Sequence, residues 1–385
     1  MKIAMVTEYL AQKGKPRYGG VDARTLNLAK NLAKNSDVHI ITSMLDGTEK
    51  LEEFDGVVIH RIGKKRKFTQ RGDFLNRLNF SSETFKEISR LRPDIVDASG
   101  FVSYAGTYKG AKRIEIPSVV TVHEVWQGEW FRNMGLINSF AGHFLEKHYL
   151  RYPFNTYIAV SNFTKDKLVS RMKIPDKKIK VVYNGIDKEL FDSVELNEKF
   201  RDPTLITVCR SVRYKRVDDL LRAVDLLKSG IPKIKLKIVG TGPEEQYLRE
   251  LSKRLNIEDN VEFMGKISDD RCLIEIMKKS HVFCLSSLAE GFGMVVIEAM
   301  ACGIPYVASD ITPIREVTHD GMGGFLFAPK DYKDLALKIG TALEENVTET
   351  NYYKIKEYIK RFDWKEKATE IKEIYVDLVN QGEVS

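Results

Sequence analysis

Short runs of β-branched and other apolar residues alternate with helix-like patterns along the whole chain, and this alternation restricts the fold more than any other feature. Many of the runs are continuously apolar, as is typical of parallel strands covered on both faces. Helical spacing of apolar residues lies between them, for example over 21–34, 218–228 and 244–255. The pattern predicts an α/β fold with parallel sheets. The predicted strands are 3–6, 38–42, 57–61, 94–96, 119–122, 157–160, 180–182, 205–208, 236–239, 261–264, 282–285 and 306–308.

A dozen strands in 385 residues are too many for one ordinary sheet, so we expect two domains. An Asn-Gly turn signal, an acidic polar stretch and Arg-Asp-Pro interrupt the pattern over 187–203. We therefore predict two doubly wound, Rossmann-like domains, residues 1–195 and 196–364, that face each other across a cleft. A content of 43% hydrophobic and 30% charged residues excludes a disordered or fibrous protein. No apolar run approaches the roughly 18 residues of a membrane span.

The two halves of the chain differ in charge. Residues 1–195 hold 32 Lys and Arg against 23 Asp and Glu, a net +9, whereas residues 196–385 hold 29 against 31, a net −2. Seven basic residues and one acid lie between Arg61 and Arg77, interleaved with aromatic and leucine residues. This segment is either a solvated loop or a contact with an anionic surface or substrate. The interleaved apolar residues are Phe68, Phe74, Leu75, Leu78 and Phe80.

The four cysteines have no CxxC spacing and lie mostly among apolar residues. We expect them to be reduced packing residues of a cytosolic protein, not a metal site or a disulfide framework. They are Cys209, Cys272, Cys284 and Cys302.

In open α/β sheets, ligands bind outside the carboxyl ends of the strands, so the residues that follow each strand matter most. A Gly-Gly pair precedes a helix after the first strand, which allows a close approach of an anion to the helix amides. Each segment alone is weak, because turns need glycine and surface loops carry arginine. Together they predict phosphate recognition at the strand ends. The segments are Gly19-Gly20, His123, Arg210 with Arg213, Lys215 and Arg216, Gly240-Thr241-Gly242-Pro243, and 286–293.

The stretch that begins at Glu290 is the most informative. It reads as an almost wholly apolar helix starting at Phe292 or Gly293, so we expect the helix to be buried together with Glu298. A buried carboxylate is costly unless it is paired or hydrogen-bonded. Glu298 therefore either pairs with a buried arginine or accepts bonds from ligand hydroxyls such as those of a ribose. Glu290 either compensates the helix-end charge or holds sugar hydroxyls beside the amides of 291–295.

These motifs, in this order, resemble the retaining family-four (group 1) glycosyltransferases of the GT-B fold. The frame E-G-F-G-x-x-x-x-E-A-M-A-x-G-x-P, which begins at Glu290, is similar to the signature of that family. The resemblance covers nearly the whole chain. Further similar positions are Gly19-Gly20, Val122-His123, Val160-Ser161, 183–187, Arg210 with Lys215, 239–243, 263–265, 308–310, Glu316-Val317 and 362–364.

The resemblance implies roles for these residues. Arg210 and Lys215 would neutralise the nucleotide diphosphate, and Glu298 would hold the ribose. Glu290 would hold the donor sugar, which His123 would approach from the first domain, and a helix over 365–385 would return to that domain. The implied catalytic set is His123, Arg210, Lys215 and Glu290. The implied donor-binding set is Gly19, Gly20, Gly240, Met264, Lys266, Gly291, Phe292, Gly293, Met294, Val295 and Glu298.

The implied reaction moves a hexosyl-type sugar from a nucleotide-diphosphate sugar to an acceptor, with retention at the anomeric carbon. Two cationic side chains would stabilise the leaving group, a role that a metal has in other transferases. No Asp-x-Asp ends a predicted strand, so we expect metal independence and no cofactor. The leaving phosphate itself would take the acceptor proton, so we expect no side chain to act as the base. The acceptor would be a saccharide, a polyol or a lipid-linked or anionic molecule, used in the cytoplasm or at the inner face of the membrane.

Three positions depart from the family pattern. Arg216 stands where a glycine normally follows the lysine, Ser286 stands where proline is frequent, and 311–313 replaces a more glycine-rich turn. Arg216 would either add a phosphate contact or point to solvent. The departures leave the sugar and the base of the donor open.

Other functions are weaker alternatives. A sugar-nucleotide epimerase of similar fold would need acid and base groups at the sugar, where chiefly His123 is available. An NAD-dependent oxidoreductase lacks the Gly-x-Gly-x-x-Gly that opens a first βαβ unit. A nucleotide-sugar sensor without turnover would have less need of Arg210, Lys215, Glu290 and Glu298. Nucleic-acid binding is not expected, because the basic excess lacks the stacked aromatic residues of a strand-binding groove.

Overall fold

The computed structural model describes residues 1–12, 15, 18–69, 73–126, 136–196, 198–344 and 349–383. The chain divides into two compact units. The first consists of Met1–Gly185 and Trp364–Ser385, and the second of Ile186–Asp363. Each unit is built around one largely parallel sheet, so the predicted α/β class with two doubly wound parallel-sheet domains is confirmed.

The first unit contains a sheet of order β3-β4-β2-β1-β5-β6-β7-β8. All neighbours are parallel except β3 and β4, which form an antiparallel hairpin at one edge. The core strands β1, β5 and β6 are fully buried over most of their length, which agrees with their apolar runs. The strands are β1 (Lys2–Thr7), β2 (Asp37–Leu45), β3 (Leu51–Phe54), β4 (Val57–Arg66), β5 (Ile95–Ser99), β6 (Ser118–Val122), β7 (Thr156–Ala159) and β8 (Ile179–Val181).

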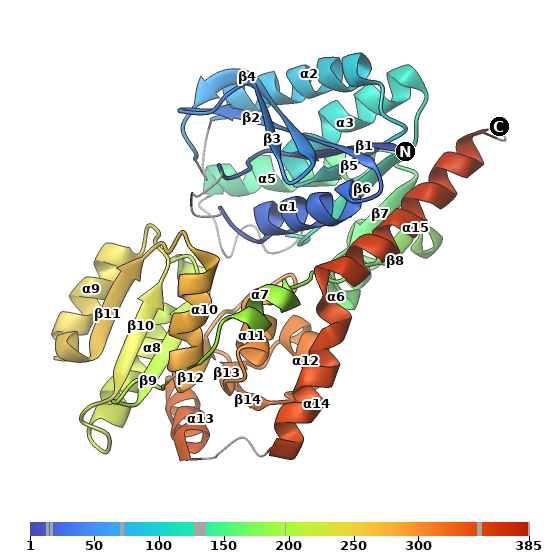
Figure 1. The fold of residues 1–385 in the computed structure, drawn as a ribbon. Helices are drawn as coiled ribbons and strands as arrows, with labels where there is room; N and C mark the ends of the chain where they lie inside the picture. Colours follow the sequence, from blue (N-terminus) through green and yellow to red (C-terminus); the bar gives the residue numbers. More distant parts are fainter. Residues whose placement is uncertain are drawn as a thin grey trace. The chain divides into compact units, whose positions relative to one another are not determined.

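Helices cover both faces of this sheet. Figure 1 shows α2 and α3 side by side on one face and α1 on the other, where the C-terminal helix α15 packs against α1. The Tyr375 hydroxyl on α15 donates a 2.6 Å hydrogen bond to Oδ2 of Asp97, a buried carboxyl on β5. The described helices of this unit are α1 (Gly20–Ala33), α2 (Phe74–Leu91), α3 (Phe101–Ile114), α5 (Leu136–Tyr149), α6 (Asn162–Ser170), the 3₁₀ turn η1 (Asp176–Lys178) and α15 (Trp364–Glu383).

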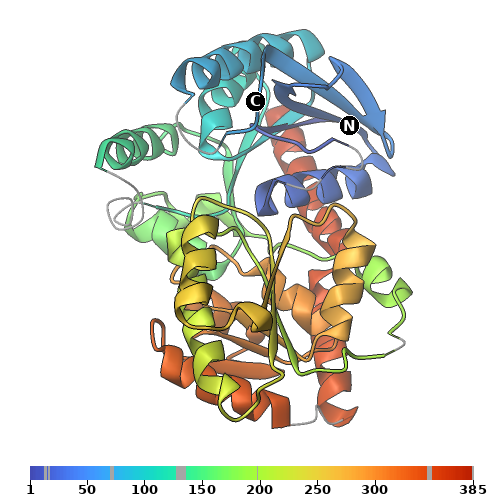
Figure 2. The same ribbon diagram turned by 90° about the vertical axis from the view of Figure 1, so that its left-hand side faces the viewer.

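The second unit contains an all-parallel sheet of order β11-β10-β9-β12-β13-β14. The order along the sheet reverses between β9 and β12, so their carboxyl ends mark a topological switch point. Figure 2 shows α8 and α9 on one side of this sheet and α10 on the other. The strands are β9 (Thr204–Val208), β10 (Lys235–Val239), β11 (Val261–Gly265), β12 (Val282–Leu285), β13 (Tyr306–Ser309) and β14 (Gly324–Phe327).

The helices of the second unit form its outer layers. Apolar residues of α8, α9 and α13 pack with β9, β10 and β12 in one buried cluster. The helices are α7 (Lys188–Ser193), α8 (Val217–Lys228), α9 (Glu245–Arg254), α10 (Asp270–Lys279), α11 (Met294–Ala301), α12 (Thr312–Thr318), α13 (Tyr332–Glu344) and α14 (Glu349–Ile359), with the 3₁₀ turns η2 (Arg213–Lys215), η3 (Glu258–Asn260) and η4 (Lys360–Phe362).

The division between the units lies at Gly185–Ile186, earlier than the boundary predicted after residue 195. The segment that includes α7 packs within the second unit. Lys278 Nζ on α10 donates to the carbonyl oxygens of Phe191 and Val194, both at 2.7 Å. These long-range contacts, which no turn signal reveals, place α7 with the second sheet.

Candidate functional site

The switch point of the second sheet brings two predicted loops together. The Ser286 hydroxyl, directly after β12, lies 2.9 and 2.8 Å from the carbonyl oxygens of Lys215 and Arg216, to which it donates. The Leu288 amide donates a 2.8 Å hydrogen bond to the Tyr214 carbonyl oxygen. These bonds join the loop after β12 to η2, which follows β9. Ser286 is thus a positioning residue, a role that its place after the strand and its departure from the family pattern did not indicate.

Lys215 and Glu290 meet where these two loops are joined. Lys215 Nζ lies 2.5 Å from Glu290 Oε1, and each side chain is 13% exposed. Burial, the largest single influence, acts to lower the pKa of Lys215, but the Glu290 carboxylate, Tyr214 and Cys209 together outweigh it, and the pKa is raised. Lys215 is therefore a fixed, partly desolvated cation at the strand ends, which suits it to an anionic ligand.

The other basic residues after β9 do not all point toward the Lys215–Glu290 pair. Arg210 is exposed, and its Nη2 donates a 2.9 Å hydrogen bond to the Tyr214 hydroxyl. Arg216 pairs instead with Asp219, where its Nε lies 2.8 Å from Oδ2, and with Asp218. These pairs hold Arg216 at the start of α8, and its predicted phosphate contact stays a prediction. Its φ of 50° lies in the left-handed region, which explains why glycine is usual at this position.

Helix α11 begins at Met294, one or two residues later than predicted, after Gly293 in the left-handed region with φ 95°. The helix is not wholly buried. Val296, Ile297, Ala299 and Met300 are buried, but Met294, Val295 and Glu298 lie on a half-buried face. The expectation that Glu298 is embedded in the core is therefore wrong. Glu298 shares this half-buried face with Met294 and Val295, and it is the fifth of the eight residues of α11.

The remaining predicted residues of the second unit are Phe292, Gly240, Gly291, Met264 and Lys266, and they differ in burial and packing. The Phe292 side chain is 4% exposed and packs edge-on against Phe362, so only its backbone is available to a ligand. Gly240 lies against the backbone after β9, where an added Cβ would stand 2.0 Å from the Cys209 carbonyl oxygen. Close packing alone therefore requires a glycine at this position. Gly291 and Met264 are half-buried and Lys266 is exposed.

In the first unit, Gly19 and Gly20 are exposed at the N-terminus of α1. Asp22 holds the preceding loop against the helix, because its Oδ2 accepts a 2.8 Å bond from the Tyr18 amide and its Oδ1 a 3.3 Å bond from the Ala11 amide. The sequence did not single out Asp22. Its place in the first helical turn after Gly-Gly was the available signal.

His123 follows β6 as predicted and lies near a buried arginine on α1. Arg24 is 1% exposed, and its Nη1 donates 2.9 Å bonds to the Tyr183 carbonyl oxygen and Asn184 Oδ1. Arg24 Nε and Nη2 and His123 Nε2 are buried atoms with no hydrogen-bond partner among the residues that the structure describes. Burial and, secondly, the Arg24 charge lower the pKa of His123 to about 3. The imidazole is thus neutral, and its Nε2 makes no hydrogen bond to the described residues.

We expect His123 to remain neutral throughout the usual assay range. Because its folded-state pKa lies below the ordinary 6.5, protonation favours the unfolded chain, and the stability that His123 contributes is present above pH 6.5 and falls as the pH drops below it. Nitrogen-15 NMR of the ring, assigned with His123→Asn, should show no titration between about pH 8 and pH 5. A midpoint near the ordinary value would contradict this environment.

Part of the basic segment is internal. Arg66 is 6% exposed and contacts Ser43 at 2.6 Å, Asp73 at 3.0 Å and Glu8 at 3.2 Å. Arg61 is likewise buried, with its Nε 2.7 Å from Glu52 Oε1. The interpretation of the whole segment as one solvated or anion-binding stretch is therefore wrong for these two arginines, because carboxylates from separate segments neutralise them.

The aromatic residues of the basic segment and of the chain beyond His123 have mixed surroundings. Phe68 stacks on Tyr18 with ring centroids 4.2 Å apart, and Phe80 is 1% exposed. Trp126 is half-buried, and its backbone amide donates a 2.8 Å bond to Glu146. The sequence places Trp130 and Phe131 just beyond His123, where Trp126, Trp130 and Phe131 would line an acceptor groove or pack, and Trp130 and Phe131 lie outside the described residues.

Among the described residues, no group of three or more His, Cys, Asp and Glu side chains could hold a metal ion. All four cysteines are free thiols. Cys284 and Cys302 are buried and Cys209 is half-buried, but Cys272 is exposed on α10, so the packing role predicted for it is wrong. Across the part of the chain that the structure covers, every helix is too short or too polar to cross a bilayer.

Comparison with known proteins gives matches along most of the chain. Residues 188–362 match the family described as glycosyl transferases group 1, and residues 18–190 match the one described as glycosyltransferase family 4. An uncharacterized glycosyltransferase of Methanocaldococcus jannaschii is 29% identical over 367 residues, which cover 90% of each chain.

Two solved structures have the same fold. Sucrose-phosphate synthase from Thermosynechococcus elongatus has a TM-score of 0.84 at 21% identity and covers 99% of both chains. The Anabaena protein HepE, in complex with UDP and glucose, has a TM-score of 0.74 at 19% identity and covers 98% of this chain and 100% of its own. The chain belongs to the group 1 glycosyltransferases, and its two parallel-sheet units have the GT-B fold.

Proposed function

We propose that this glycosyltransferase moves a hexosyl group from a nucleotide-diphosphate sugar to an acceptor with retention of the anomeric configuration. The Lys215–Glu290 pair at the switch point of the second sheet carries this proposal. A diphosphate needs fixed positive charge and a sugar needs hydrogen-bond acceptors, and the joined loops supply both within 2.5 Å of each other.

Other residues of the second unit extend the proposed donor site. Arg210 adds a second cation to the diphosphate, and the accessible face of α11 offers Glu298 to the ribose hydroxyls. The backbone of 291–295, at the N-terminus of α11, contacts the sugar, and the strand end at Met264 and Lys266 meets the base. Gly240 supports the site by letting the loop after β10 pack on the loop after β9.

In the first unit, we assign Gly19 and Gly20 to the donor phosphates and His123 to the transferred sugar. The exposed N-terminus of α1 and the neutral ring of His123, with its buried unpartnered Nε2, support these roles. A neutral imidazole can form hydrogen bonds with sugar hydroxyls. Because it carries no charge, it does not compete with Lys215 and Arg210 for the diphosphate. The acceptor attacks the anomeric carbon from the same face that the diphosphate leaves, and the leaving phosphate takes the acceptor proton there. Attack on that face preserves the anomeric configuration.

The proposed acceptor is a saccharide, a polyol or a lipid-linked anionic molecule, used in the cytoplasm at the surface of an anionic membrane. The net +9 of residues 1–195 supports an anionic acceptor or surface. No nucleic-acid partner is proposed.

A screen of nucleotide sugars against saccharide, polyol and lipid acceptors tests the reaction. Proton NMR of the product should show the anomeric configuration of the donor preserved, and nucleoside diphosphate should appear in equal amount to the product. An inverted product would overturn retention. Conversion of the donor sugar without release of nucleoside diphosphate would indicate the epimerase alternative instead.

Transfer should not depend on a divalent cation, because Lys215 and Arg210 supply the positive charge at the leaving diphosphate. The initial rate is expected to be unchanged, within about twofold, after dialysis against EDTA. Loss of activity that magnesium or manganese restores would show that a metal performs this role.

A further inference from the structure

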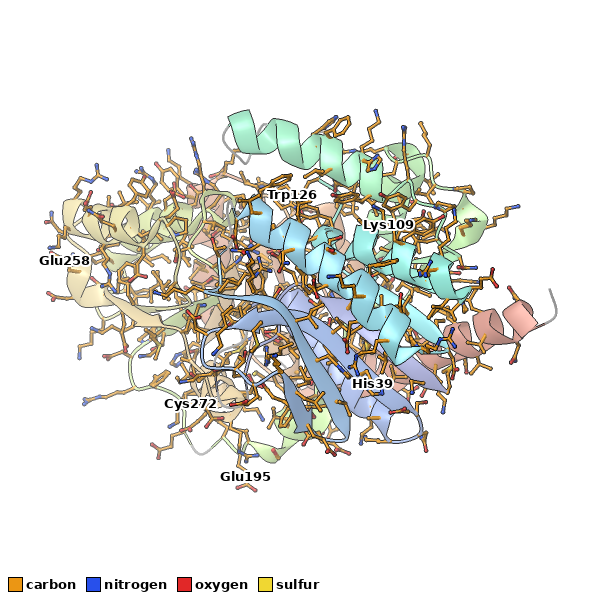
Figure 3. The ribbon with its side chains drawn as sticks, turned by 90° about the horizontal axis from the view of Figure 1, so that it is seen from above. His39, Lys109, Trp126, Glu195, Glu258 and Cys272 are labelled. Carbon is orange, nitrogen blue, oxygen red and sulfur yellow. The ribbon has the colours of Figure 1, made fainter. Side chains whose placement is uncertain are left out.

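The outer face of the first two turns of α2 is apolar and exposed. Phe74 is 58% exposed, Leu75 79% and Leu78 45%, although the opposite face of the same helix buries Phe80 and Ile88. Figure 3, which looks down on this side of the first unit, shows α2 with no other drawn helix or strand in front of it. Adjacent exposed apolar side chains of this size mark an interaction surface more often than single ones do.

The end of β4 places lysines beside this apolar face. Lys64, Lys65 and Lys67 are exposed, whereas Arg66 between them turns inward. Two bonds fix the strand end to α2 and to the residue before it. The Lys64 amide donates to Asn79 Oδ1 at 3.0 Å, and Arg66 Nη1 donates to Asp73 Oδ2 at 3.0 Å. The lysines and the apolar side chains are therefore held next to each other.

A surface pocket of about 370 Å³ opens at the junction of β4 and α2. Lys50, Arg61, Lys64 and Asn79 are among its lining residues. Arg61 is already bonded to Glu52, but the ammonium groups of Lys50 and Lys64 have no hydrogen-bond or ion-pair partner among the described residues. The lining acid Glu83 is paired with Lys86 at 2.8 Å. The pocket thus offers two uncommitted cations to an anion.

We propose that this surface docks on an anionic phospholipid bilayer, with the α2 side chains in the interface and a lipid phosphate group in the pocket. Phe74, Leu75 and Leu78 supply apolar area, and Lys64, Lys65, Lys67 and Lys50 supply charge. A stable membrane contact generally needs both signals. The inference rests on the proposed membrane location but not on the transfer reaction, since none of its residues belongs to the proposed catalytic or donor-binding set.

Co-sedimentation of the full chain with vesicles tests the proposal, without nucleotide sugar present. Vesicles of phosphatidylcholine with phosphatidylglycerol should bind the protein, and vesicles of phosphatidylcholine alone should not. The triple variant K64Q/K65Q/K67Q should bind roughly a hundredfold more weakly, because each such lysine contributes about fivefold. Leu75→Ser with Leu78→Ser should weaken binding by more than about tenfold at any salt concentration.

Matched variants separate this surface from general charge and hydrophobicity. K173Q/K177Q/K180Q removes the same charge from exposed positions of the same unit, and Leu337→Ser removes a leucine from α13 whose exposure, 67%, lies between those of Leu75 and Leu78. Both should bind vesicles like the unaltered chain. All variants should retain the melting temperature, because the replaced side chains are on the surface.

Three outcomes would overturn the proposal. The first is failure to bind anionic vesicles at low salt. The second is equal weakening by the control triple, which would show that only net charge matters. The third is binding of inorganic phosphate that Lys50→Gln and K64Q abolish, without any vesicle binding, which would assign the pocket to a free phosphate. Donor hydrolysis in solution, measured in parallel, reports separately on the proposed reaction.

Discussion

Replacing Lys215 with alanine is expected to remove most sugar-transfer activity while the second unit stays folded. The lysine is held between the loops after β9 and β12 and would neutralise charge that develops on the leaving diphosphate. Loss of one preorganised electrostatic contact of this kind typically costs about 3 kcal/mol, or about a hundredfold in kcat. The measurement is the initial rate of nucleoside diphosphate release with saturating donor and acceptor.

Arg213→Ala is the matched control, because it removes an equal charge from an exposed position of the same 3₁₀ turn. It should retain transfer within about threefold, whereas Arg210→Ala should resemble the Lys215 variant. Circular dichroism and thermal melting establish that each variant is folded. Near-normal turnover in the folded Lys215 variant would remove the residue from the proposed donor site.

The strands and the strand-end loops were predictable because their signals are local. All twelve predicted strands are present, and the loops after β9 and β12 were recognised from their glycines and charges. Two strands were missed. The β3–β4 hairpin had a signal in Asp55-Gly56, which occupy the left-handed region with φ 52° and 76°, but the acidic sequence of β3 obscured it. Strand β14 begins at Gly324, and glycine is depleted in strands.

The surroundings of charged side chains were not predictable, because they depend on residues far apart in the chain. Arg66 reads as one member of a basic run, yet it is buried by contacts with Glu8, Ser43 and Asp73. Arg24 reads as an ordinary helix residue, yet it is among the most deeply buried side chains. Helical periodicity predicts which face of a helix is buried, but it does not predict which carboxylate or carbonyl group binds a given cationic side chain.

Gly240→Ala is expected to destabilise the second unit by more than about 3 kcal/mol, because overpacking and an unfavourable φ add together. An added Cβ would lie 2.0 Å from the Cys209 carbonyl oxygen and 3.0 Å from its carbon, at a φ of 118°. Neither backbone can move freely. The Cys209 amide donates to the Val239 carbonyl oxygen at 3.0 Å, and the Ser211 amide to that of Thr241 at 3.2 Å. Urea-induced unfolding measures the loss.

Gly265→Ala separates the two contributions. Gly265 also has a positive φ, 64°, but no atom lies within 4 Å of the position its Cβ would take. The substitution should therefore cost only about 1 kcal/mol, from the backbone conformation alone. Because the Gly240 variant must also displace the backbone that leads to Arg210, its folded fraction should have lower transfer activity than the Gly265 variant. Equal stabilities of the two variants would show that the loop after β10 yields to the added methyl group, and the close packing assigned to Gly240 would be wrong.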